Sequence, residues 1–167
     1  MRVWKLDANI DTDALAPGAY MKQDIASIAT HCLELVRPEF ASQVQKDDVI
    51  VAGENFGIGS SREQAASVLV QLGVAAVIAP SYSGLYFRNA FNVGLLLLTC
   101  ADVATIDDGD EIELVSGVPF SIKTKSNVAN DLLRCAPVPQ FLLDMVNAGG
   151  LLNKLKADSF NARQLSA

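Results

Sequence analysis

The hydrophobic pattern divides most of the chain into short apolar runs and longer segments with apolar residues at helical spacing. The short runs have the length of β-strands and lie at residues 1–6, 48–53, 74–80 and 95–100. Residues 23–36, 60–73 and 82–94 have the pattern of helices with one buried face, and Gly73 follows the second of them as a helix C-terminal glycine does. This succession of strands and helices predicts a layered α/β domain.

The rest of the chain adds a second kind of pattern. The run at 74–80 is apolar at every position, which is typical of a strand covered on both faces. Residues 111–125 form two alternating runs joined at the sequence SGVP, which predicts a hairpin. Residues 138–158 are helical in pattern and are interrupted by Gly149 and Gly150. Because there is no internal repeat or long linker, residues 1–167 are expected to form a single domain.

The composition narrows the classes of partner. Half of the residues are hydrophobic and the net charge is −6, without a basic cluster. Nucleic acid and anionic membranes attract basic surfaces, so neither is expected as a partner. No apolar run approaches the roughly 20 residues of a membrane span, and Arg2 and Lys5 are followed by polar residues rather than by the apolar part of a signal peptide. We therefore expect a cytoplasmic protein.

The cysteines and the single histidine do not suggest a metal site. Cys32, Cys100 and Cys135 lie far apart in the sequence, whereas a zinc or iron–sulfur site within one chain needs clustered ligands. We expect three ordinary thiols and no metal or cofactor bound by this chain. His31 falls outside the apolar stripe of residues 23–36 and is expected to be a solvated helix residue.

The sequence GENFGIGSSREQA at residues 53–65 allows two interpretations from its residues alone. Ser60 and Glu63 have the spacing of a capping box, in which each side chain satisfies a backbone amide at the start of a helix. The glycines and Arg62 also fit an anion site, because glycine lets the backbone approach a ligand and a helix N-terminus offers free N–H groups. A dinucleotide loop fits poorly, since Arg62 replaces its third glycine, and the Lys of a Walker A loop is missing.

The same stretch carries a resemblance to a known family. Together with NIDTD at residues 9–13, SYSGLYFRNAFNVGLLLL at 81–98 and the Gly-Gly break, it resembles the small subunits of 3-isopropylmalate dehydratase, which correspond to the mobile swivel domain of aconitase. The resemblance implies a swivelling β/β/α three-layer fold. It also implies one half of a hydro-lyase acting on a small hydroxy di- or tricarboxylic acid, with a [4Fe–4S] cluster carried by a large subunit.

The resemblance also implies roles for three residues of the glycine–serine stretch. Ser60 is the catalytic base, acting as an alkoxide that removes a proton α to a carboxylate. Ser61 and Arg62 bind a substrate carboxylate, Arg62 through its fork of donors. Arg62 and the helix N-terminus are the groups that this sequence offers to favour the alkoxide.

Further residues are implicated in the segment at 7–23. Asp13 matches a catalytic-site aspartate that orders the site, Thr12 precedes it as a substrate-binding residue, and Lys22 is a candidate for contacting a distal carboxylate. From the residues alone, the first two also fit an Asx-rich turn and Lys22 a solvated lysine.

The substrate is less well defined than the reaction, because Ala19 and Gly84 depart from the commonest family pattern. Isopropylmalate in leucine biosynthesis is favoured, while homoaconitate and dimethylmalate-type acids, or a non-catalytic anion-binding module, stay open.

Overall fold

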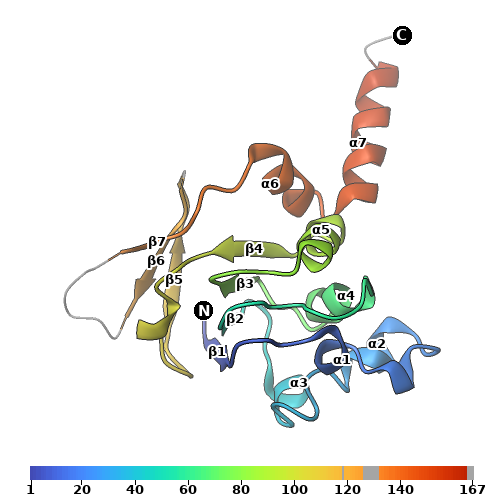
Figure 1. Cartoon of the computed structure of the whole chain (residues 1–167). Coiled ribbons are helices and arrows are strands. Elements are labelled where there is room, and N and C mark those ends of the chain that lie inside the picture. The colour runs from blue at the N-terminus through green and yellow to red at the C-terminus, as the bar shows by residue number, and fades with distance from the viewer. Residues whose placement is uncertain (118, 126–131, 165–167) are drawn as a thin grey trace.

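The computed structural model describes residues 1–117, 119–125 and 132–164, with side chains described to residue 160, and arranges them in three layers (Figure 1). The middle layer is a parallel sheet in the order β1 (Val3–Leu6), β2 (Val49–Ala52), β3 (Ala76–Ala79) and β4 (Leu96–Thr99). One face carries helices α1 (Thr12–Leu15), α2 (Ile25–Ala29), α3 (Phe40–Gln43), α4 (Gln64–Gln71) and α5 (Gly84–Asn92), with the short 3₁₀ helix η1 (Gly18–Tyr20).

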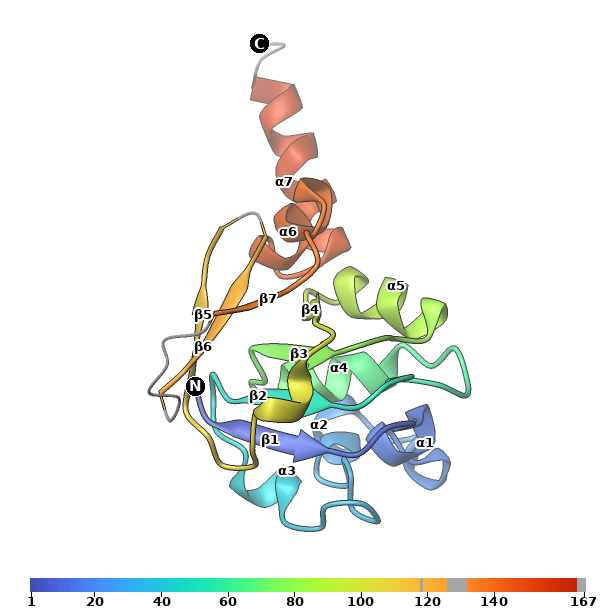
Figure 2. The same cartoon turned by 60° about the vertical axis from the view of Figure 1, so that its left-hand side comes forward.

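The other face of the parallel sheet is covered by an antiparallel sheet of β5 (Ile112–Val115), β6 (Ser121–Thr124) and β7 (Leu133–Arg134). The 3₁₀ helix η2 (Val103–Thr105) leads into it. The chain ends in α6 (Gln140–Asn147) and α7 (Leu151–Gln164), and α7 extends away from the body of the molecule in both views (Figures 1 and 2). The expected β/β/α architecture is therefore confirmed.

The strand order explains why the helices lie on one face. Connections between parallel strands of one sheet are almost always right-handed. Because each connection here advances by one strand in the same direction, every crossover places its helices on the same side. The opposite face keeps an apolar surface, which the antiparallel sheet buries.

Two apolar cores result, one on each face of the parallel sheet. Strand residues that face the helices include Trp4, Leu6, Ile50, Ala52, Val77, Ala79 and Leu97. Strand residues that face the antiparallel sheet include Val3, Val49, Val51, Ala76, Ile78 and Leu98. The alternation confirms that the run at 74–80 is covered on both faces. Each buried Val, Ile or Leu side chain contributes roughly 1.5–3 kcal/mol to the free energy of folding, relative to the same side chain exposed to water.

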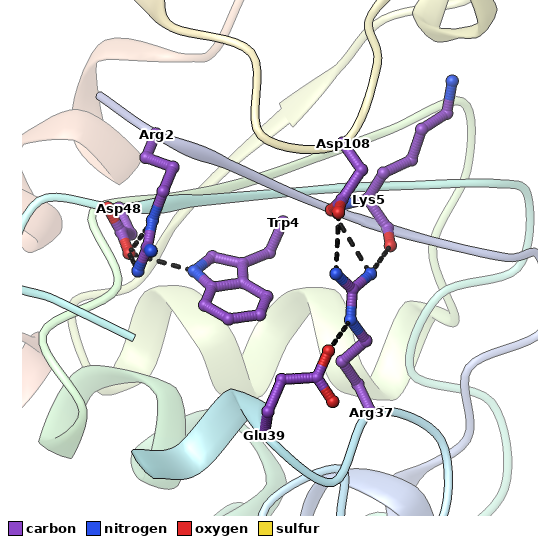
Figure 3. A network of polar contacts seen from close by, with 7 residues as sticks. All are labelled: Arg2, Trp4, Lys5, Arg37, Glu39, Asp48 and Asp108. Atoms are coloured by element: carbon purple, nitrogen blue, oxygen red, sulfur yellow. Dashed lines mark hydrogen bonds and ion pairs between the residues drawn. The ribbon is translucent and has the colours of Figure 1, made fainter. Parts of the chain in front are cut away.

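A polar network fixes the outer edge of this sheet at β1 (Figure 3). The buried Asp48 accepts hydrogen bonds from Trp4 Nε1 at 2.9 Å and Arg2 Nη2 at 2.6 Å. Burial raises the pKa of Asp48, but the hydrogen bonds from Arg2, the Gln45 amide and Trp4 outweigh burial and keep the pKa below its ordinary value. The Arg2 guanidinium also lies 4.7 Å from the centre of the Trp4 ring. Through its bonds to Arg2 and Trp4, the Asp48 carboxylate joins the start of β1 to the residue before β2.

On the other side of Trp4, Arg37 completes the network. Its guanidinium lies 5.3 Å from the Trp4 ring and pairs with Asp108 at 2.7 Å and Glu39 at 2.6 Å. The ion pair of Arg37 with Asp108 thereby joins the loop before β5 to the helical layer.

The helix expected over residues 23–36 is shorter than predicted. It ends at Ala29 as α2, and turns follow, because Leu33 takes a φ of 60° and donates its N–H to the Ala14 carbonyl at 2.7 Å. This tertiary bond replaces a helical one, and Val36 is left 44% exposed. His31 is not a solvated helix residue: its ring stacks on Tyr20 at 3.6 Å and Nδ1 lies 2.7 Å from Glu34.

The other predicted strands and helices are present, but the helices expected over residues 60–73 and 82–94 are shorter, as α4 (Gln64–Gln71) and α5 (Gly84–Asn92). The hairpin appears as β5 and β6, with Val118 of its SGVP turn lying outside the described residues. Gly73 follows α4 with a φ of +82°. The Gly-Gly break lets the turn between α6 and α7 pack against the end of α5: a Cβ on Gly150, which has a φ of +108°, would lie 2.6 Å from the Asn92 carbonyl oxygen.

This contact predicts that Gly150→Ala lowers the free energy of unfolding by about 1–3 kcal/mol, because the new methyl group meets backbone and the left-handed conformation is strained. The matched control is Gly84→Ala in the first position of α5, where no atom lies within 4 Å of the added Cβ and φ is not positive. The control should leave the stability unchanged or raise it by up to about 1 kcal/mol. Urea unfolding of both variants measures the difference, and equal stabilities would contradict the packing role of Gly150.

Candidate functional site

The candidate residues meet where β1 and β2 end. In Figure 2 the arrow of β1 points toward α1, at the edge of the sheet from which the connection between β2 and α4 also leaves. Beyond the strands, the two connections remain paired through backbone hydrogen bonds: Asn9 N to Glu54 O at 2.8 Å, Gly57 N to Ile10 O at 2.7 Å, and Thr12 N to Ile58 O at 2.8 Å. The pairing brings Thr12 and Asp13 beside the glycine–serine stretch, at the carboxyl edge of the sheet where α/β proteins usually bind ligands.

Two glycines of the stretch are required by close contacts. Gly57 has a φ of +78° and lies on the ring of Tyr86 in α5, where a Cβ would come within 2.1 Å of Tyr86 Cγ. Gly59 has a φ of +102°, and its Cβ would lie 3.1 Å from Thr12 Oγ1. The glycine spacing thus lets the loop pass between α5 and Thr12.

The predicted capping box is wrong. Helix α4 begins at Gln64, its N-cap residue Glu63 has helical backbone angles, and no side chain caps it. Ser60 therefore lies four residues before the helix. Its amide and hydroxyl both contact Thr12 instead, so the serine is not used as a helix cap.

Thr12 and Ser60 form the centre of the site. Thr12 is 2% exposed, whereas Ser60 is exposed. Thr12 Oγ1 accepts the Ser60 N–H at 2.9 Å and lies 3.0 Å from Ser60 Oγ. Once Ser60 loses its proton, the Thr12 hydroxyl is the donor in that contact. A hydrogen bond donated to the charged form of a group favours that form, so Thr12 favours a Ser60 alkoxide.

Arg62 is held by one of its terminal nitrogens. Nη1 forms an ion pair with Asp13 and donates to the Ala16 carbonyl at 3.1 Å. Within the described residues, Nε and Nη2 have no hydrogen-bond partner, which leaves the side of the guanidinium that binds a carboxylate in a bidentate manner available. The hydrogen bond and charge of Arg62 hold the pKa of Asp13 below its ordinary value, so Asp13 is a carboxylate that orients Arg62.

The other two predicted substrate-binding residues, Ser61 and Lys22, are both exposed. The Ser61 side chain is exposed next to Ser60, and its carbonyl accepts a hydrogen bond from Asn89 Nδ2 at 2.9 Å. Lys22 is exposed in the turn after η1, and its side chain has no hydrogen bond or ion pair to the part of the chain that the structure describes. The structure therefore brings together five of the six predicted site residues, namely Thr12, Asp13, Ser60, Ser61 and Arg62.

Asn89 was not among the residues singled out from the sequence. A polar residue three positions after Tyr86, on the buried face of α5, was the available signal. The Gly18 amide, which donates to Asp13 at 3.2 Å, was also not predicted.

A hollow of about 520 Å³ adjoins the site. Its lining consists of three acidic residues, a glycine and five apolar residues: Asp11, Asp13, Glu34, Gly18, Ala14, Pro17, Ala19, Leu35 and Val36. Ala19, one of the departures from the family pattern, thus lies on the wall of this hollow.

The cysteines do not form a cluster site. Cys32 lies in the core under the helices, where burial raises the pKa of its thiol, and Cys100 and Cys135 lie in the core between the sheets. Over residues 1–117, 119–125 and 132–164, no group of three His, Cys, Asp or Glu side chains could hold a metal ion. Because Cys32 lies in one core and Cys100 and Cys135 in the other, the three cysteines do not form the clustered ligand set that an iron–sulfur cluster needs. No described helix is long and apolar enough to cross a membrane.

Comparison with known proteins agrees with this geometry. The aconitase C-terminal domain profile matches residues 8–103. The 3-isopropylmalate dehydratase small subunit 1 of Thermotoga maritima is 42% identical over 159 residues, which are 93% of each chain. The methanogen homoaconitase small subunit of Methanothermobacter thermautotrophicus is 44% identical, covering 91% of this chain and 87% of its own.

A solved structure has the same fold. The crystal structure of 3-isopropylmalate dehydratase from Methanocaldococcus jannaschii superposes with a TM-score of 0.90 at 36% identity, covering 98% of this chain and 96% of that one. The profile match, the identities and the superposition together place the glycine–serine loop and its partner Thr12 in a shared domain. The chain belongs to the aconitase C-terminal domain family, among the small subunits of 3-isopropylmalate dehydratase and its relatives.

Proposed function

We propose that this chain is the small subunit of an iron–sulfur hydro-lyase that interconverts 2- and 3-isopropylmalate by dehydration and rehydration in leucine biosynthesis. The observation that carries the proposal is the contact of Ser60 with the buried Thr12, beside an arginine with free donors. The proposed base Ser60, the hydroxyl of Thr12 that would favour its charged form and the proposed carboxylate-binding Arg62 thus lie on neighbouring loops. The names of the relatives support the reaction class.

Ser60 acts in the proposal as the base that removes the proton next to a carboxylate. A serine hydroxyl is a very weak acid, so its alkoxide needs strong local stabilisation. Thr12 donates a hydrogen bond to it, and Arg62 adds a positive charge nearby. The dipole of α4 contributes less than the sequence suggested, because the effect of a helix end fades within one turn and Ser60 lies four residues before α4.

Arg62 binds a substrate carboxylate through Nε and Nη2, with the Ser61 hydroxyl as a further donor. Asp13 and the Ala16 carbonyl hold Nη1, so the guanidinium is oriented before substrate arrives. Such pre-orientation lowers the entropy cost of binding.

The remaining chemistry belongs to a partner. The designation of the relatives as small subunits supports a large subunit. The proposal assigns to that subunit the [4Fe–4S] cluster, which supplies a Lewis acid for the leaving hydroxyl when bound. The cysteines of this chain, divided between two cores, do not serve as its ligands.

The hollow beside Asp13 favours isopropylmalate as the substrate. Its lining contains apolar side chains and carboxylates but no basic residue, so it suits an apolar substituent better than a further carboxylate. The 44% identity to a homoaconitase small subunit makes a homoaconitase-type acid the second candidate.

Removing the proposed base provides the direct test. In the complex with the large subunit, Ser60→Ala should lower kcat by about a thousandfold or more, the upper range for loss of a general base. Because Ser60 is exposed and caps no helix, the free energy of unfolding should change by less than about 0.5 kcal/mol. The control Ser67→Ala, in α4, should keep normal turnover. Turnover within a few-fold of wild type in Ser60→Ala would rule out the base.

Asp13 should act as a permanent charge. Its pKa lies below the ordinary value of 3.8, so the carboxylate is charged above that pH and its contribution is lost only as pH falls through the lowered pKa. Asp13→Asn should therefore lower kcat/KM about 10- to 100-fold by freeing Arg62, and by the same factor from about pH 6 to pH 9. Rate profiles over this range measure the ratio. A ratio that changes with pH there would mean that Asp13 titrates in the working range.

Substrate choice can be tested from the hollow. The complex should turn over 3-isopropylmalate with a kcat/KM about 100-fold or more above that for homoaconitate-type and dimethylmalate-type acids. Ala19→Arg should raise the relative kcat/KM for the homoaconitate-type acid by providing a cation, and Ala26→Arg in α2, away from the hollow, should not. A preference of the wild-type complex for a charged tail would overturn the isopropylmalate assignment and favour the second candidate.

A further inference from the structure

Helix α5 contacts the glycine–serine loop through two of its side chains. The Tyr86 ring packs against Gly57. Asn89, about one turn further along α5, contacts the peptide group between Ser61 and Arg62. Asn89 is 6% exposed, and its Nδ2 donates to the Ser61 carbonyl oxygen at 2.9 Å. The buried polar residues of the described structure are Thr12, Asp48, Asn89 and Thr124. Two of these four, Thr12 and Asn89, contact this loop.

The bond from Asn89 determines which way a peptide group faces. In a trans peptide the C=O and N–H point in opposite directions. Because the Ser61 carbonyl is turned toward α5, the N–H of Arg62 is turned away from α5. Within the described residues this N–H has no acceptor. A backbone donor is thus left available beside the guanidinium of the same residue.

We propose that Asn89 is a positioning residue, which fixes the peptide between Ser61 and Arg62 so that the Arg62 N–H binds the same substrate carboxylate as the Arg62 side chain. This inference rests on the proposed function. The carboxylate gains negative charge when the neighbouring proton is removed, and a fixed donor is most effective where charge develops. Asn89 itself does not touch the substrate in this arrangement; it acts through the loop.

A merely structural role of Asn89 makes a different prediction. If the side chain only fills space and satisfies its own polar atoms, any well-folded replacement of similar volume would keep activity. If the bond to Ser61 matters, activity depends on a donor at this position, and restoring the donor restores activity.

The isosteric variant Asn89→Asp tests this in the complex with the large subunit. Its charged carboxylate cannot donate to the Ser61 carbonyl, so kcat/KM should fall about 10- to 100-fold at high pH. Burial raises the pKa of a carboxyl group, and below that pKa the introduced O–H is a donor again. The ratio of variant to wild-type kcat/KM should therefore rise toward one as pH falls. Asn89→Leu should show a similar loss without this recovery.

Asn92→Asp, at the end of the same helix and with no side-chain bond to the loop, is the matched control and should keep normal activity at every pH. Thermal unfolding and co-purification with the large subunit establish that each variant is folded and assembled. If Asn89→Leu does not fold, the pH series of Asn89→Asp alone decides, because it follows how one folded variant changes relative to wild type as pH falls.

The outcomes are distinct. A wild-type complex that turns over none of the tested acids overturns the proposed function and this inference with it. An active wild-type complex with equally active Asn89 variants, or a loss in Asn89→Asp that does not recover at low pH, overturns this inference alone.

Discussion

The parallel pairing of β1 with β2 is the interaction on which the site depends. The strands pair from Val3 with Val49 to Leu6 with Ala52, and hydrogen bonds continue between the loops that follow, as far as Thr12 and Ile58. Residues about 48 positions apart in sequence are thereby held in hydrogen-bond contact. The buried Asp48 with Arg2 and Trp4 secures this pairing at its start, so an edge contact far from the site helps to set its geometry (Figure 3).

The glycine–serine loop is determined by its neighbours rather than by its own helix. A serine followed by Glu at the third position has a good local reason to cap a helix, worth about 1 kcal/mol. In the fold, Thr12 Oγ1 accepts the Ser60 N–H and also contacts the Ser60 hydroxyl. Asn89 Nδ2 donates to the Ser61 carbonyl. These long-range bonds delay the start of α4 and leave the serine hydroxyl exposed.

The strands, α5 and the Gly-Gly break could be predicted because local patterns determine them: continuous apolar runs, helical periodicity and glycine chemistry. The helix over residues 23–36 could not, since the bond from Leu33 to Ala14 joins segments whose contact no local pattern reveals. The roles of the six predicted site residues were assigned through family resemblance and stay predictions. The bonds of Thr12 and Asn89 to the loop depend on tertiary contacts that no local pattern reveals. Lys22, in addition, has no described contact that ties it to the other five.

In the proposed function, the charges of the site give the large subunit a part in binding a dicarboxylic acid. The chain has a net charge of −6, which does not attract such a substrate from a distance, and salt screens charges beyond roughly 8 Å. Recognition must then rest on short-range donors. Among the described residues that the fold brings together here, Arg62 is the single cation, and Asp13 already offsets part of its charge. The proposed function has one substrate carboxylate bound by the free nitrogens of Arg62 and leaves the second to cations of the large subunit. The proposal thus assigns to this chain the donors for one carboxylate and the base beside it, and to the large subunit the groups that bind the rest of the substrate.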